Sequence, residues 1–225
     1  MIKRMIIPMI FGLGGVAVLL SLGVWQMQRL SWKEAALADI DARIVAAPVA
    51  LPETPDPERD RYLPVVATGQ ILAEELDVLV SIKHVGPGFR VISPFVTEDG
   101  RRIMVDRGFV GEIDKDTARP VIQVTLIGNL HWPNEVDGFT PAPDLGRNIW
   151  FARDVDAMAT ALEAEPLLLI LRETSENDPS VMPLPVTTVG ISNDHLNYAI
   201  TWFSLAALWL GMTLYLLWRI RQRTI

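Results

Sequence analysis

MIIPMIFGLGGVAVLLSLGVWQMQ, residues Met5–Gln28, contains no charged side chain, and neither does LNYAITWFSLAALWLGMTLYLLW, residues Leu196–Trp218. As a helix, each run would extend about 35 Å, which exceeds the roughly 30 Å of hydrocarbon in a bilayer. The first run is longer than the apolar region of a signal peptide, and no A-x-A cleavage site follows it. The two runs therefore predict permanent membrane-spanning helices at residues 5–28 and 195–218.

The charges around the two runs predict how the chain lies across the membrane. The tails, residues 1–4 and 219–225, carry five basic residues and no acidic one. Both tails are therefore expected in the cytoplasm and the middle, residues 29–194, in the periplasm. Because only Met1–Arg4 precede the first span, a mitochondrial transit peptide is not expected, and a bacterial inner membrane is the expected location.

Composition excludes several classes of function. The 20 Lys and Arg residues and 27 Asp and Glu residues give a net charge of −7, which argues against a nucleic-acid partner. The part between the spans holds 15 of the basic residues and every acidic one, a net charge of −12. The absence of cysteine excludes a disulfide, a thiolate metal site and a cysteine nucleophile.

The part between the spans has the pattern of a small α+β domain with a mainly antiparallel sheet and short helices. Strands are expected at Tyr62–Ile71, Leu76–Ile82, Phe89–Thr97, Arg102–Val110, Val121–Leu130, Asn148–Phe151 and Leu167–Leu171. An amphipathic helix is expected at Trp32–Ala47 and a short one at Asp154–Ala164. Asp99-Gly100 is typical of a tight hairpin turn. The prolines at residues 48–64 predict an extended linker, and those at residues 179–185 are expected to stiffen the approach to the second span.

No pattern for catalysis is present, so the chain is expected not to be an enzyme. Its three histidines form no H-E-x-x-H motif, and no G-x-S-x-G occurs, so no catalytic or metal-binding residue is predicted. Gly12-Leu13-Gly14-Gly15 favours helix packing by small residues over a nucleotide loop, because it lies within a span. Gly86-Pro87-Gly88 is explained by a turn before the hairpin.

Two sets of residues share a membrane depth at the outer interface. His195 opens the second span, with Tyr198 and Trp202 on its helical face, and Trp25 and Arg29 share a face at the end of the first. These residues could form a haem site, in which an imidazole ligates iron, aromatic rings stack on the macrocycle and an arginine pairs with a propionate. Interfacial aromatic anchors and a snorkelling arginine are the alternative, and spacing alone favours it.

The motifs of the chain, taken in order, resemble those of the Surfeit locus protein 1 family of cytochrome oxidase assembly factors. The opening signature is Leu22-Gly23-Val24-Trp25-Gln26-Met27-Gln28-Arg29 with Trp32-Lys33. It is followed by Arg61-Tyr62, Gly69, Gly86-Pro87-Gly88, Val91, Pro94-Phe95, Val105-Asp106-Arg107-Gly108-Phe109-Val110, Asn193-Asp194-His195-Leu196-Asn197-Tyr198-Ala199 and Thr201-Trp202. Order, spacing and the two predicted spans agree over most of the chain, although residues 171–186 have no match.

The resemblance implies a function in the assembly of a haem-containing terminal oxidase. Bacterial members are thought to bind haem A and to help insert it into the largest oxidase subunit. His195 corresponds to the family histidine proposed as haem ligand, which makes Tyr198, Trp202, Trp25 and Arg29 the expected pocket residues. Haem A is then a transient cargo, the largest oxidase subunit and membrane lipid are expected partners, and haem A synthase is a further candidate partner.

Two other functions remain open at this point. One is a haem-free scaffold that stabilises nascent oxidase subunits, and the other is a membrane-anchored hydrolase with His84 or His131 as base. Arg107 and Gly108 are expected to have a structural or docking role. For Arg107 this is a buried or interface ion pair, and for Gly108 a close approach of two backbones.

Overall fold

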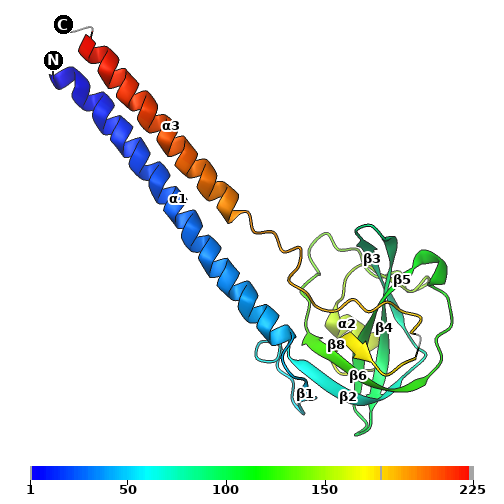
Figure 1. Ribbon diagram of the computed structural model, residues 1–225. Coiled ribbons are helices and arrows are strands. Elements are labelled where there is room, and N and C mark those ends of the chain that lie inside the picture. Colours follow the sequence, from blue (N-terminus) through cyan, green and yellow to red (C-terminus); the bar gives the residue numbers. More distant parts are fainter. Residues whose placement is uncertain (1, 178, 223–225) are drawn as a thin grey trace. The chain divides into compact units, whose positions relative to one another are not determined.

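The computed structural model describes residues 2–177 and 179–222, and side chains from residue 5 onward. The chain forms two compact units (Figure 1). The first, Met1–Asp39 with Thr188–Ile225, is called the helix pair, and the second, Ile40–Thr187, is called the sheet domain. Each unit is described by itself.

The helix pair consists of α1 (Ile2–Ile44) and α3 (His195–Gln222), of which α1 continues into the sheet domain. Among the described residues, these two helices are long and apolar enough to cross a membrane, which agrees with a two-pass membrane protein. The prediction of a separate amphipathic helix at Trp32–Ala47 was wrong, because α1 runs without interruption to Ile44. Its later turns are rich in alanine and leucine, which favour helix.

Small residues of α1 let α3 pack closely. A Cβ atom on Gly12 would lie 2.1 Å from Thr213, and one on Gly15 would lie 2.4 Å from Trp209. The indole nitrogen of Trp209 also donates a hydrogen bond to the Gly12 carbonyl over 3.1 Å. These contacts show that Gly12 and Gly15 serve helix packing, as expected of small residues between membrane helices, whereas a Cβ atom on Gly14 would meet nothing within 4 Å.

The described residues of the sheet domain form eight strands and a short helix. They are β1 (Val49–Ala50), β2 (Pro64–Ile71), β3 (Leu76–Ile82), β4 (Gly86–Thr97), β5 (Arg102–Gly111), β6 (Ile122–His131), β7 (Ile149–Trp150), β8 (Leu168–Thr174), α2 (Val155–Ala161) and the 3-10 turn Glu112–Asp114. The strand order is β1-β2-β6-β8-β5-β4-β3-β7, with an additional β2–β4 pairing. The α+β class with a mainly antiparallel sheet is confirmed, with three parallel pairings: β1–β2, β3–β7 and β5–β8.

The pairing of β2 with both β6 and β4 closes five strands into a ring. The closure depends on Gly69 of β2, because a Cβ atom there would lie 2.1 Å from the Val96 carbonyl oxygen. Strands β5 and β8 are buried on both sides. Ile103 and Leu169 belong to one apolar core, while Met104 and Leu168 belong to a second core that α2 covers. Consecutive apolar residues are typical of strands buried on both faces.

Candidate functional site

His195 is the first residue of α3, and its ring contacts Gln26 of α1. The imidazole Nδ1 lies 2.7 Å from the amide oxygen Oε1 of Gln26, whose residue is 9% exposed. A carboxamide oxygen only accepts hydrogen bonds, so Nδ1 is the donor and carries the ring proton. In the neutral ring, this leaves the lone pair that binds a metal ion on Nε2.

Small residues follow His195 along the same face of α3. Ala199 and Ala206, four and eleven positions on, are buried, and Trp202, seven positions on, is partly buried. On α1, Gly23 is buried together with Gln26, and a Cβ atom on Gly23 would lie 2.5 Å from the Phe203 ring. These residues bring the two backbones close enough for the His195–Gln26 hydrogen bond.

The remaining predicted pocket residues lie at the surface of the helix pair. Tyr198 is 56% exposed and Trp25 is 50% exposed. Arg29 is exposed, and its guanidinium lies over the Trp32 ring, 4.7 Å from the ring centre. Trp202 therefore shares the inner face of α3 with His195, whereas the other three residues present their side chains outward.

The segment before α3 is attached to α1 by a second polar contact. The Lys33 ammonium donates to the Ser192 carbonyl oxygen, and the Ser192 hydroxyl donates to the Asp194 carboxylate over 2.6 Å. The Asp194 carbonyl accepts from the Tyr198 amide, which belongs to the first turn of α3. The position of His195 is therefore supported from α1 both at Gln26 and at Lys33.

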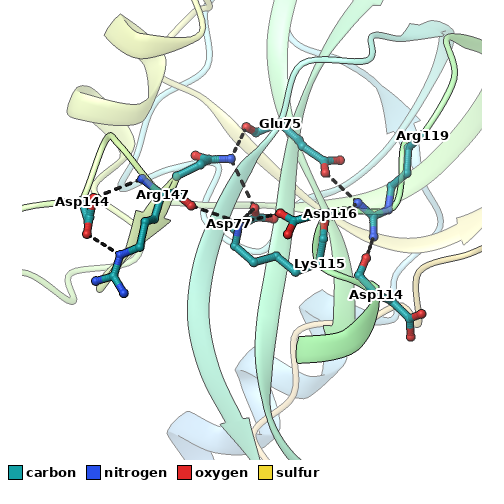
Figure 2. Close-up of polar contacts among 9 residues, drawn as sticks. Glu75, Asp77, Asp114, Lys115, Asp116, Arg119, Asp144 and Arg147 are labelled. Carbon is teal, nitrogen blue, oxygen red and sulfur yellow. Dashed lines mark hydrogen bonds and ion pairs between the residues drawn. The ribbon is translucent and has the colours of Figure 1, made fainter.

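A second polar cluster lines a cavity of about 630 Å³ in the sheet domain (Figure 2). Arg119 pairs with Glu75 over 2.6 Å and Lys115 with Asp77 over 2.9 Å, and burial raises the pKa of both carboxyl groups. Among the described residues, Oε2 of Glu75 and Oδ1 of Asp77 lack a hydrogen-bond partner, and both atoms are covered by protein. A molecule in the cavity would not reach them, so we assign these pairs to holding residues 112–119 against β3.

Two residues of the motif Asp106-Arg107-Gly108 on β5, Asp106 and Arg107, form buried ion pairs. Oδ2 of Asp106 accepts from Arg90 over 2.6 Å and from Arg153 over 3.4 Å. Arg107 is 3% exposed and lies 3.3 Å from the Glu176 carboxylate. The expected buried ion pair of Arg107 is thus confirmed.

Gly108 lies at the point where two backbones approach each other. Its φ is +119°, and a Cβ atom would lie 2.0 Å from the Met182 carbonyl oxygen. Met182 forms a two-way backbone bridge with Phe109, and Val181 beside it is 3% exposed. The expected close approach at Gly108 is confirmed, and the proline-containing stretch at residues 179–185 packs on β5.

The two histidines of the hydrolase hypothesis lie in different surroundings. His84 is exposed in the turn between β3 and β4. His131 stacks on Tyr62 with ring centres 5.2 Å apart, and burial, helped by Arg153, lowers its pKa to about 4. A general base is usually oriented by a carboxylate and has a pKa near the working pH. Among the described residues, no carboxylate is hydrogen-bonded to either ring, and no cluster of three or more metal-ligating side chains is present.

The low pKa of His131 predicts a loss of stability in acid. Between about pH 4 and pH 6.5, His131 is protonated in the unfolded chain but not in the folded chain. The free energy of unfolding therefore decreases as the pH falls through that range. After discounting for solvent screening, we expect a loss on the order of 2 kcal/mol. Urea unfolding of the full chain in detergent at several pH values measures it. His131→Phe should flatten the pH dependence, His84→Gln should not, and equal slopes in all three proteins would refute the assignment.

Comparison with known proteins identifies one family along most of the chain. The model of the SURF1 family matches residues 13–207. Surfeit locus protein 1 of Xenopus tropicalis is 31% identical over 214 residues, covering 83% of this chain and 68% of the relative. The human protein of that name is 31% identical over 213 residues, which cover 83% of this chain and 69% of the human protein. The SURF1-like protein of Rickettsia felis is 31% identical over 206 residues, which cover 84% of this chain and 87% of the relative. Because the family model covers most of the chain and these relatives are similar to it over most of their length, this chain belongs to the SURF1 family.

Proposed function

We propose that this protein is an assembly factor for a haem-A-containing terminal oxidase, and that it binds haem A and helps insert it into the largest oxidase subunit. Membership of the SURF1 family supports the assembly role. The observation that carries haem binding is the His195–Gln26 hydrogen bond, which in the neutral ring leaves Nε2 of His195 as the ligand atom.

The residues around His195 suit a haem molecule chemically. A neutral imidazole is a common axial ligand of haem iron. Trp202 and the outward-facing Tyr198 and Trp25 supply aromatic surface for the macrocycle, and the exposed guanidinium of Arg29 can pair with a propionate. Haem A is the cargo of this site, and iron ligation by His195 is the chemistry that would hold it.

The membrane arrangement follows from the charges of the tails. We place the chain in a bacterial inner membrane with both tails in the cytoplasm and residues 29–194 in the periplasm. His195 then lies at the periplasmic membrane surface, where the apolar tail of haem A can stay in lipid and its propionates in water. Loading from haem A synthase and delivery to the largest oxidase subunit would both take place at this surface.

Loss of haem A in His195→Ala is the expected result that tests this function. The full chain is purified from membranes that make haem A, and bound haem is measured by its optical and pyridine-haemochrome spectra. The wild type should carry haem A and His195→Ala should lose most of it. His84→Ala, which removes an exposed histidine of the sheet domain, should keep it.

A colourless wild type from cells shown to contain haem A would favour the second candidate, a haem-free scaffold for nascent oxidase subunits. One observation favours that candidate. Ala207 and Gly211, four residues apart on α3, are exposed, and a Cβ atom on Gly211 would meet nothing within 4 Å. This small-residue pair is open to another membrane helix.

A further inference from the structure

We propose that Gln26 is the positioning residue for His195, which fixes the imidazole tautomer so that Nε2 presents its lone pair to the iron of the cargo. The inference rests on the proposed haem-binding function and assigns a role to a residue that spacing and aromatic character did not identify. Its basis is the 2.7 Å contact between Nδ1 of His195 and Oε1 of Gln26, made where Gln26 is buried.

A neutral imidazole has two tautomers, and the partner of one nitrogen decides which nitrogen binds metal. Metal-binding histidines usually donate their second N–H to a carboxylate or a carbonyl, which orients the ring and increases its basicity. The Gln26 amide oxygen supplies such an acceptor from the neighbouring helix. His195 is thereby prepared as an Nε2 ligand before any haem arrives.

An amide acceptor suits this position better than a carboxylate for two physical reasons. Gln26 lies in the charge-free run of residues 5–28, where an ionised side chain would be costly to bury. An amide oxygen is also a weaker hydrogen-bond acceptor than a carboxylate. It therefore increases the basicity of the imidazole less and strengthens the iron–histidine bond less. A moderate bond agrees with a protein that has to release its cargo.

The alternative is that the hydrogen bond only holds α1 and α3 together, as polar side chains between membrane helices often do. The two roles differ in what a matched set of substitutions does. Gln26→Leu removes the acceptor and retains the bulk, and Gln26→Glu restores an acceptor. Gln28→Leu makes the same change on the exposed side of α1 and is the control.

The first test needs no haem. Nitrogen-15 NMR of the full chain in detergent micelles, recorded well above the ordinary imidazole pKa of about 6.5, reports which ring nitrogen is protonated. The wild type, Gln28→Leu and Gln26→Glu should show a proton on Nδ1 of His195, and Gln26→Leu should show it on Nε2 or shared. A wild type protonated on Nε2, or a tautomer unaltered in Gln26→Leu, would overturn the proposal.

The second test uses haem A itself, titrated into each variant. Gln26→Leu should bind about 10- to 100-fold more weakly than the wild type, the usual effect of losing such a partner. Gln26→Glu should bind tightly and raise the iron–histidine stretching frequency, and Gln28→Leu should match the wild type. Equal affinity in Gln26→Leu and Gln28→Leu would refute the inference. If the wild type binds no haem A, the proposed function fails, while the tautomer result still stands.

Discussion

Asp106→Asn is expected to lower the free energy of unfolding of the sheet domain by about 3–5 kcal/mol, the usual cost of removing one partner of a buried ion pair. The Asp106 carboxylate is 1% exposed and accepts from Arg90 and Arg153 on one oxygen and from the Gly108 amide on the other. An asparagine presents only one oxygen and no charge. It therefore leaves two partly buried guanidinium groups under-compensated.

Urea unfolding of the full chain in detergent, followed by pulse proteolysis, measures this loss. Asp144→Asn is the matched control, because Asp144 pairs with an Arg147 side chain that is 72% exposed. The control should cost less than about 1 kcal/mol, as surface ion pairs do. Similar losses in both variants would show that the Asp106 pairs contribute no more than a surface contact.

Most strands of the sheet domain could be predicted because their signals are local. Alternation and turn residues place β2 to β6 within two or three residues of their observed bounds, and Asp99-Gly100 marks the hairpin between β4 and β5. Strand order carries no such local signal. The parallel β5–β8 pairing and the closure of β2 on β4 join residues that are far apart in the sequence. They depend on which apolar faces fit together, and that information is spread over the whole domain.

The candidate site was predictable in part for a similar reason. Helical periodicity alone places Trp202 on the face of His195. Periodicity within α1 cannot tell which of its faces meets α3, because the rotation of one helix against another is set by packing. Gly23 and Ala199 permit the close approach, and Gln26, next to the conspicuous Trp25, is the residue that meets His195. A neutral amide inside the charge-free run was the available signal, and Gln28 carries the same signal on the exposed side of α1.

Gly108→Ala is expected to lower the free energy of unfolding of the sheet domain by about 3 kcal/mol or more and to detach residues 179–187 from β5. Two effects add at this position. An alanine would be held at a φ of +119°, which L-residues rarely adopt, and its Cβ would lie 2.0 Å from the Met182 carbonyl oxygen. Backbone cannot move aside as the end of a side chain can, so relief requires breaking the hydrogen bonds between Phe109 and Met182.

Two other glycines separate these effects. Gly100 has a φ of +85°, and a Cβ atom there would meet nothing within 4 Å, so Gly100→Ala should show the conformational cost alone, about 1–2 kcal/mol. Gly111 has open space and no positive φ, so Gly111→Ala should change stability little. Urea unfolding ranks the three variants, and limited proteolysis with thermolysin reports cleavage within residues 179–187. One result would contradict this prediction: Gly108→Ala lowers the free energy of unfolding no more than Gly100→Ala does, and residues 179–187 stay protected from thermolysin. Met182 would then not require a glycine opposite it.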